Sequence, residues 1–285
     1  MKVLVLSRRG IAKAFTGDST QMRQTIRYLR PLVEKITQVF VDNDGCLYDE
    51  NDSPLGDKLS SLCSQHDVAH QLPRLNFRAH KAIQQHLSKI PTVVSTVYWH
   101  DIARVIIAWR NSSGFKNKLL STMRSSRAGS KRLQDYRVGC DVILPNSWAE
   151  GENVRKHFRL ASHVESMPVP NAIEVPEFDV EKLPKPEFIA FDEYVVCPAV
   201  FASRKNQIAL IRALKHENIP VVFMGDSLED AHDFWEMCQR EATEKMLFIP
   251  HIDNKSKEYW SVLRHARCAC LPADCETPGI ALLEA

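Results

Sequence analysis

The chain has 285 residues, of which 44% are hydrophobic and 25% are charged, and its net charge is +2 with histidine neutral. This is an ordinary globular balance with room for two domains, and the net charge argues neither for nor against nucleic-acid binding. No apolar run reaches the ~18 residues needed to span a bilayer. The amino terminus places its apolar run before Arg8 and Arg9, which is the reverse of a signal peptide.

Eight cysteines are scattered along the chain, and several lie inside apolar, strand-like runs. This pattern favours reduced thiols in a cytoplasmic protein. Cys268, Cys270 and Cys275 lie close together in sequence. Alternate residues on a buried strand are more often core residues than metal ligands, so we expect no metal site there.

In the first half of the chain, short β-branched runs alternate with amphipathic segments. The expected strands are residues 2–6, 38–41, 67–70, 92–97 and 141–144. The expected helices are residues 21–33, 79–88 and 149–159, the last with Asn146 and Ser147 as candidate caps. Such alternation predicts a parallel sheet in a domain that covers residues 1–170.

Five prolines and several acids between Pro168 and Pro186 mark a linker, which we place at residues 171–190. A second alternating unit follows over residues 191–285. Its expected strands are residues 194–197, 220–224, 246–249 and 268–271, and its expected helices are residues 207–215, 230–241 and 257–265. The sequence therefore predicts an α/β protein with two sheet domains and an active-site cleft between them.

The segment from Arg104 to Arg137 is strongly basic, with nine Lys or Arg residues and Asp135 as its one acid. Apolar residues such as Trp109 and Phe115 are interleaved with the charges. One interpretation is an element that lies on a membrane surface. The alternative is a solvated helical face over an ordinary core.

The last stretch of the chain, ETPGIALLEA, carries two carboxylates, Glu276 and Glu284, with seven residues between them. Glu276 follows an expected strand, and open α/β sheets bind ligands beyond the carboxyl ends of their strands. A helix that opens at Pro278 would offer the unpaired amides of Gly279 and Ile280 to an anion such as a diphosphate. Glu284 would then suit ribose hydroxyls. The alternative is that Glu276 caps the helix and Glu284 is solvated.

This stretch resembles the signature of the retaining nucleotide-sugar glycosyltransferases of glycosyltransferase family 4, the glycosyl transferases group 1. Four further motifs stand in the family's order: NSWAEGENVRKHF (146–158), VPNAI (169–173), SRKNQIALIRAL (203–214) and FIPHID (248–253). The resemblance spans most of the chain. It implies the GT-B fold, in which two Rossmann-like domains face a cleft, with an acceptor-side domain first and a nucleotide-sugar-binding domain second.

The resemblance also implies how the chain holds the donor phosphates. Lys205, with Arg204 beside it, lies where the family has its diphosphate-binding lysine. The family usually carries a Gly-Arg pair just before this loop, but Ala199 and Val200 stand there. One of the two expected phosphate cations is therefore missing. The alternative for Lys205 is a solvated lysine at a helix start.

Three further loops complete the implied donor site. Gly17 precedes the first helix, where the family's loop faces the donor phosphates and a glycine permits close backbone approach. His100 follows a strand and is expected to contact the sugar or the leaving group, the alternative being a structural histidine. His251 and Ile252 follow the third strand of the second domain, near which the nucleotide base packs. No residue type there distinguishes uridine from guanosine.

On this resemblance, the chain is a retaining hexosyltransferase of polysaccharide biosynthesis that uses a UDP-, GDP- or other nucleotide sugar without a cofactor or metal. Lys205 and the amides of Gly279 and Ile280 stabilise the diphosphate, Glu276 holds sugar hydroxyls, and Glu284 binds ribose. With His100, these residues form the implied site. The acceptor is a glycan or a lipid-linked glycan rather than nucleic acid. We expect a cytoplasmic location, with peripheral contact at the inner face of the membrane through residues 104–137.

A second function class competes with the transferase. VFVDNDGCLYD (39–49) resembles the first motif of haloacid-dehalogenase-like phosphatases, with Asp42 as nucleophile and Asp44 as the second carboxylate. VVFMGDSLED (221–230) resembles their Mg²⁺ motif through Asp226 and Asp230, and such carboxylate pairs serve aspartyl-phosphate chemistry. This interpretation leaves VPNAI and the terminal glutamates unexplained, so we favour the transferase. A third possibility is a GT-B fragment that binds a nucleotide sugar without transferring it.

The chain stops at Ala285, directly after the terminal motif. A complete second domain of this family would continue the helix that begins near Gly279, add further strands and return a last helix across the first domain. Glu284 is the penultimate residue, and the strand at residues 268–271 would be left as a sheet edge. We therefore expect a truncated second domain in a chain that is prone to aggregate and weakly active or inactive.

Overall fold

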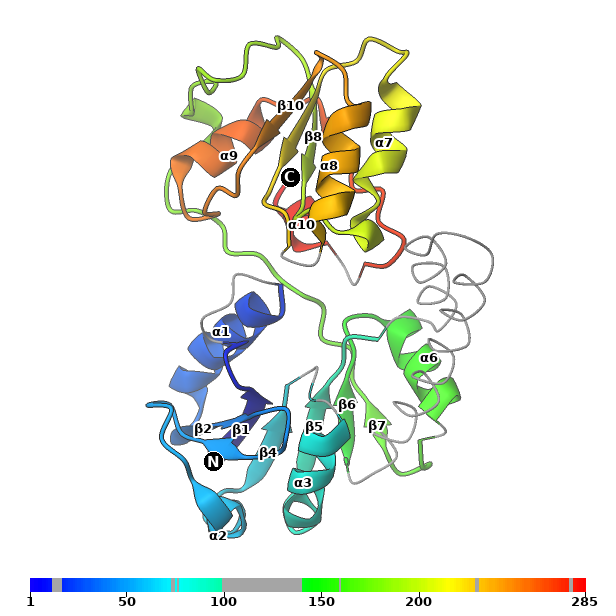
Figure 1. The fold of residues 1–285 in the computed structure, drawn as a ribbon. Helices are drawn as coiled ribbons and strands as arrows, with labels where there is room; N and C mark the ends of the chain where they lie inside the picture. The colour runs from blue at the N-terminus through cyan, green and yellow to red at the C-terminus, as the bar shows by residue number, and fades with distance from the viewer. Residues whose placement is uncertain are drawn as a thin grey trace, which may run out of the picture. The chain divides into compact units, whose positions relative to one another are not determined.

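The computed structural model describes residues 1–11, 17–72, 75, 77–98, 140–158, 160–228, 231–276 and 279–285. These residues divide into two compact units, one up to Asn171 and one from Ala172 onward, and each has its own sheet (Figure 1). In this part of the chain, no helix combines the length and the apolar character needed to cross a membrane.

The first unit contains, in its described residues, a seven-stranded sheet in the order β3-β2-β1-β4-β5-β6-β7, parallel except for β3. Its strands are β1 (Lys2–Arg8), β2 (Lys35–Val41), β3 (Leu47–Tyr48), β4 (Val68–Gln71), β5 (Thr92–Ser95), β6 (Val142–Leu144) and β7 (Glu165–Ser166). The five central residues of β1 are buried. This is expected for a parallel strand whose two faces are both covered.

Helices pack on both faces of this sheet. They are α1 (Gly17–Leu29), α2 (Leu59–Ser64), α3 (Phe77–Leu87) and α6 (Trp148–Phe158). Because successive side chains of a strand point to opposite faces, Val5 of β1 packs with Met22 of α1, and Leu6 packs with Ile83 of α3. Val154 of α6 packs in a further cluster beside β6. The apolar residues of β1 thus serve two separate cores.

The second unit contains, in its described residues, a four-stranded parallel sheet in the order β10-β9-β8-β11. Its elements are β8 (Val195–Pro198), α7 (Gln207–Leu214), β9 (Val221–Met224), α8 (His232–Glu241), β10 (Met246–Ile249), α9 (Lys257–Arg264), β11 (Cys268–Ala269) and α10 (Ile280–Glu284). Phe223 of β9 packs with α7 and α8 on one face, while Ile249 of β10 packs with Trp260 of α9 on the other.

The strand order of the second sheet reverses at β8. The chain runs from β8 outward to β9 and β10, and then returns to place β11 on the other side of β8. The loop after β8 therefore leads toward β9 on one side of β8, while β11 lies on the other side. In open α/β sheets, ligands bind in the crevice at such a switch point, beyond the carboxyl ends of the strands.

The proline-rich segment that we expect to link the domains packs against the second unit. Ile173, Phe178 and Leu183 contact the core cluster that contains Trp260. The Leu183 carbonyl lies 2.9 Å from Nε2 of His265. This segment therefore adds apolar cover to the α9 face of the second sheet.

Candidate functional site

The loop after β8 lies tightly against the loop after β9. Gly225, which follows β9, has a φ of +150°, and a Cβ at this position would lie 2.4 Å from the Ala199 carbonyl oxygen. Gln207 is fully buried, and its Nε2 donates to the Val200 carbonyl at 2.9 Å. These contacts fix the backbone at the two positions where the resembled family usually carries Gly-Arg.

Gly225→Ala is expected to lower the free energy of unfolding by about 3 kcal/mol, because the new Cβ meets backbone atoms of Ala199 that cannot move without β8. Urea denaturation followed by circular dichroism measures this loss. Gly10→Ala is the matched control, since Gly10 has a φ of +80° but nothing within 4 Å of an added Cβ. Its expected cost is about 1 kcal/mol. Equal losses in the two variants would contradict the close approach at Gly225.

A short 3-10 turn, Ser203–Lys205, follows the β8 loop and carries two basic side chains. The turn ends at Asn206, whose φ of 58° lies in the left-handed region that asparagine tolerates. The Asp274 amide donates to the Arg204 carbonyl at 2.9 Å. This bond ties the turn to the segment after β11, which carries Glu276.

Two cations of this turn meet one carboxylate oxygen. The Lys205 ammonium donates to Oε2 of Glu276, and Nη1 of Arg204 lies 3.8 Å from the same oxygen. The Lys205 side chain is only 11% exposed, against 26% for Arg204 and 25% for Glu276. Burial lowers the pKa of Lys205, and the charge of Glu276 opposes that shift. The group has more positive than negative charge and lies at the strand ends of the switch point.

Glu284 lies on α10, and both of its carboxylate oxygens accept hydrogen bonds. Oε1 accepts from Nδ2 of Asn254 at 3.0 Å, and Oε2 accepts from the Tyr259 hydroxyl. Burial raises the pKa of Tyr259, and the neighbouring carboxylate raises it further, so the hydroxyl stays a donor. Sequence reasoning missed Asn254 and Tyr259 because they lie on the loop before α9 and on α9 itself, outside any motif spacing.

The helix that carries Glu284 is short and begins at Ile280, with Gly279 as its N-cap residue. The Gly279 carbonyl accepts from the amides of Leu282 and Leu283 at 2.9 and 3.2 Å. A Cβ at Gly279 would lie 3.0 Å from Cδ2 of Leu271 and 3.4 Å from Cγ of Glu276. The start of α10 is therefore packed close to the carboxylate that holds the two cations.

The loop after β10 holds the residues that the resemblance assigns to the nucleotide base. The His251 amide donates to Oδ1 of Asp226 at 3.0 Å, and Ile252 packs on the α9 face of the sheet. A cavity of about 390 Å³ lies beside this loop, toward α8. It is lined by Gly225, Asp226, Ser227, His232, Trp235, Gln239, Phe248, Ile249 and Pro250. The structure thus provides space for a ring-sized group next to the predicted base loop.

Four other predicted features gain little from the structure. Gly17 follows β1 in the chain order, as the sequence predicts, but it is the first residue of α1 rather than part of a loop before the helix, because the helix begins four residues earlier than expected. His100 lies outside the described residues, and so do Asp230 and the basic segment 104–137.

Buried polar side chains gather at the carboxyl ends of β4 and β5 in the first unit. Nε2 of His70 lies 2.8 Å from Oγ of Ser95, and burial lowers the pKa of His70 to about 4. Glu150 accepts from Oγ1 of Thr96 at 2.7 Å and from the Tyr98 amide at 2.8 Å. Burial raises the pKa of Glu150, which these hydrogen bonds oppose. Sequence reasoning missed this group, because a polar residue at a strand end carries no periodic signal.

The low pKa of His70 predicts a loss of stability in mild acid. Between pH 7 and pH 5 the unfolded chain binds a proton at this residue, with a pKa near 6.5, while the folded chain does not. Stability therefore falls as the pH drops below 6.5 and levels off below about 4. We expect the wild-type chain to lose about 2 kcal/mol more than His70→Asn between pH 7 and pH 5. Parallel stability curves from urea titrations at the two pH values would contradict the assignment.

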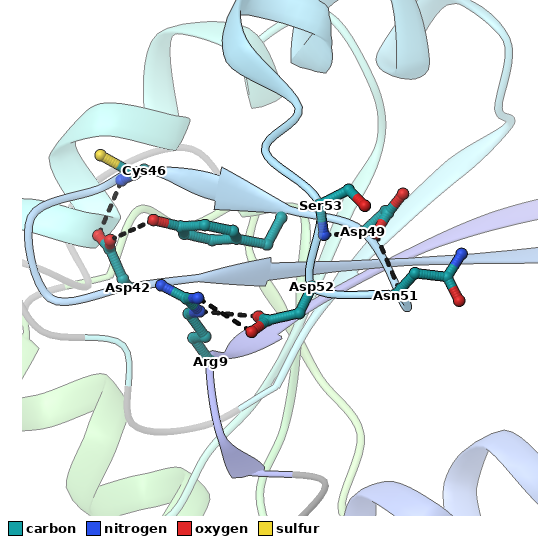
Figure 2. A network of polar contacts seen from close by, with 8 residues as sticks. Arg9, Asp42, Cys46, Asp49, Asn51, Asp52 and Ser53 are labelled. Carbon is teal, nitrogen blue, oxygen red and sulfur yellow. Dashed lines mark hydrogen bonds and ion pairs between the residues drawn. The ribbon is translucent and has the colours of Figure 1, made fainter.

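The β2–β3 hairpin contains the first aspartates of the phosphatase alternative (Figure 2). Oδ1 of Asp42 accepts from the amides of Asp44 and Cys46, each at 2.9 Å, and Oδ2 accepts from the Tyr48 hydroxyl at 3.2 Å. Burial acts to raise the pKa of Asp42, but these hydrogen bonds hold it below its usual value. Asp42 thus makes the contacts of a turn-forming residue, a common use of aspartate.

The same hairpin is attached to the end of β1. Nε and Nη2 of Arg9 donate to the two carboxylate oxygens of Asp52 at 2.8 and 3.0 Å, and the guanidinium lies 3.6 Å from the centre of the Tyr48 ring (Figure 2). The aspartates and tyrosine of this hairpin therefore form a local structural network.

Comparison with known proteins finds a family model that matches most of the second unit. Residues 179–285 match the model of the family described as "Glycosyl transferases group 1". A search of the curated proteins by sequence finds no match. The predicted resemblance to the glycosyl transferases group 1 is confirmed over these residues, and the phosphatase alternative gains no support.

Solved structures match the whole chain at low sequence identity. Sucrose-phosphate synthase from Thermosynechococcus elongatus is 12% identical with a TM-score of 0.65, and the match covers 100% of this chain and 78% of that chain. Anabaena HepE in complex with UDP has the same coverage and TM-score at 13% identity. The lipopolysaccharide outer core galactosyltransferase WaaB is 12% identical, with a TM-score of 0.56 and coverage of 100% and 77%. These matches confirm the predicted α/β fold of the GT-B class.

Proposed function

We propose that this chain, which carries a glycosyl transferases group 1 domain over residues 179–285, is a retaining hexosyltransferase that uses a nucleoside-diphosphate sugar. The observation that carries the proposal is the meeting of Lys205 and Arg204 with Glu276 at the switch point of the second sheet. These residues lie about 70 positions apart in sequence and within the matched segment.

Departure of a nucleoside diphosphate develops negative charge, and preorganised positive groups are the largest expected source of transition-state stabilisation. Lys205 is assigned to the leaving phosphate because it is mostly buried and held at a fixed point by the 3-10 turn. The amides of Gly279 and Ile280 are assigned to the same diphosphate. Glu276 is assigned to hydroxyls of the transferred sugar, for which a carboxylate is a strong acceptor.

The remainder of the donor follows the chain order of the second unit. Glu284 is assigned to the ribose, with Asn254 and Tyr259 holding its carboxylate in position. The base is assigned to the loop of His251 and Ile252, beside the cavity of about 390 Å³. Anabaena HepE, whose fold this chain shares, was solved in complex with UDP, which supports a UDP-sugar as the first donor to test.

The acceptor is proposed to be a glycan or a lipid-linked glycan, as in polysaccharide biosynthesis. Gly17 is assigned to the donor phosphates and His100 to the sugar or leaving group, both from the family resemblance. The basic segment 104–137 is assigned to peripheral contact with a membrane at its cytoplasmic side. In a retaining reaction the acceptor hydroxyl attacks from the side of the leaving group, whose phosphate oxygen takes the proton.

The test is release of UDP or GDP from a panel of nucleotide sugars by residues 1–285, with and without glycan acceptors. We expect slow turnover of one donor, and NMR of the product should show the anomeric configuration of the donor retained. Binding of a donor without release would support a binding fragment instead of an enzyme. If no nucleotide sugar binds, while Mg²⁺-dependent hydrolysis of p-nitrophenyl phosphate is abolished by Asp42→Asn, the transferase proposal fails.

A further inference from the structure

The contacts of Glu276 suggest which side chain replaces the arginine that the resembled family usually has at the position of Val200. Oε2 of Glu276 is the common partner of Lys205 and Arg204. Each of the three side chains is at least about three-quarters buried. Largely buried cations are costly unless an anion lies close by. The position of this carboxylate oxygen therefore marks a point on which two positive charges converge.

The backbone around Arg204 is fixed from two sides. Its carbonyl accepts from the Asp274 amide at 2.9 Å, and the turn that carries it ends at Asn206 in the left-handed region. Nδ2 of Asn206 also lies 3.5 Å from Oδ1 of Asp274. The turn and the segment before Glu276 are thus one connected unit.

Among the side chains of Lys205, Arg204 and Glu276, positive charge exceeds negative charge. Lys205 and Arg204 contribute two positive charges and Glu276 contributes one negative charge. A diphosphate would supply more negative charge and more acceptor oxygens than a single carboxylate does, and a guanidinium binds phosphate through two parallel hydrogen bonds. A diphosphate would therefore neutralise the charges of the two cations more completely than the observed carboxylate does.

We propose that Arg204 supplies the second phosphate-binding cation that Val200 lacks, and that Glu276 occupies the anion position in the unliganded chain until a diphosphate displaces it. This inference rests on the proposed function, because it assigns the diphosphate of the donor to these residues. It adds that donor binding exchanges one anion for another. The carboxylate released in this exchange becomes available to the sugar hydroxyls.

The test is calorimetric titration of residues 1–285 with inorganic pyrophosphate. Arg204→Gln is expected to weaken pyrophosphate binding about tenfold, and Lys205→Gln at least as much, because each loses a charge-assisted hydrogen bond. Glu276→Gln is expected to strengthen binding about tenfold, because the competing charge is gone. Arg212→Gln is the control, since Arg212 forms an exposed bidentate ion pair with Glu241 on the same unit.

Two further variants keep the test decisive. Val200→Arg added to Arg204→Gln should restore pyrophosphate affinity, because it returns a cation to the position used by the resembled family. Arg204→Lys keeps the charge and guards against a folding defect in the glutamine variant. Unchanged or weaker binding by Glu276→Gln, or equal affinities of Arg204→Gln and Arg212→Gln, would overturn the inference. So would a wild-type chain that binds no pyrophosphate.

Assays with nucleotide sugars test the proposed function separately from the role of Arg204. If pyrophosphate binding follows the expected order but no nucleotide sugar is bound, the anion site stands and the transferase proposal fails. If nucleotide sugars are turned over while Arg204→Gln behaves like Arg212→Gln, the transferase stands and the role of Arg204 is wrong.

Discussion

Lys205→Ala is expected to reduce the rate of sugar transfer by about 10³-fold, the loss typical of removing one preorganised group that stabilises charge in a transition state. The Lys205 side chain is mostly buried and belongs to the 3-10 turn Ser203–Lys205. A hydrogen bond from the Asp274 amide connects this turn to the loop after β11. Water reaches this point poorly, so it cannot replace the ammonium. The loss should appear in kcat rather than only in KM, because the charge on the leaving phosphate develops during the reaction.

The measurement is steady-state release of nucleotide from the donor identified in the panel. Lys182→Ala is the matched control, because the Lys182 side chain is 84% exposed and pairs only locally with Asp179 at 2.8 Å. A thermal melt of each variant separates lost chemistry from lost folding. Nη1 of Arg204 lies 3.8 Å from Oε2 of Glu276 in the wild-type chain, so Glu276 should keep a neighbouring cation in Lys205→Ala and a large loss of stability is not expected. Equal rates for the two alanine variants would remove Lys205 from the mechanism.

The sequence predicts much of this fold because all described strands except β3 run parallel in their sheets. The run around Val5 and the run around Phe223 are continuous and apolar, as buried parallel strands require. Sequence reasoning missed two of the described strands that are only two residues long and predicted too long a range for the third. β3 (Leu47–Tyr48) and β7 (Glu165–Ser166) are too short to show a periodic pattern. β11 pairs at Cys268–Ala269, although all four residues of the expected strand 268–271 are apolar.

The candidate site likewise has one part that the sequence predicts and another part that only the folded structure shows. The spacing of Glu276 and Glu284 and the order of the motifs are properties of the sequence, and they located the β8 and β11 loops. The partners of these residues are properties of the fold. Nothing near Glu284 in sequence indicates that Tyr259 donates to it, because the contact depends on how α9 and α10 pack.

Asp42 shows how a short motif misleads when it is taken without its partners. An aspartate two residues before another, after a strand, is shared by a phosphatase nucleophile and by a tight turn. The turn uses both oxygens of Asp42, for the amides of Asp44 and Cys46 and the hydroxyl of Tyr48. Only the hydrogen-bond contacts distinguish the two uses, and the spacing of the motif does not predict these contacts.

Glu276→Gln is expected to lower kcat/KM for sugar transfer by about 10²-fold, even though the same substitution strengthens pyrophosphate binding. Its carboxylate is assigned to sugar hydroxyls in the reacting complex, and an amide is a weaker acceptor for them. Glu284→Gln is the control on the same short segment. Glu284 contacts Asn254 and Tyr259 rather than the two cations, so its replacement should weaken nucleotide binding without changing affinity for pyrophosphate.

The opposite signs make this prediction informative. If Glu276 only held the loop in shape, its replacement would disorder Lys205 and Arg204, and transfer and pyrophosphate binding would fall together. If Glu276 only competed with the diphosphate, its replacement would raise both donor binding and turnover. Loss of transfer with a gain in pyrophosphate affinity requires one carboxylate to occupy the anion position in the empty site and to act on the sugar in the filled one.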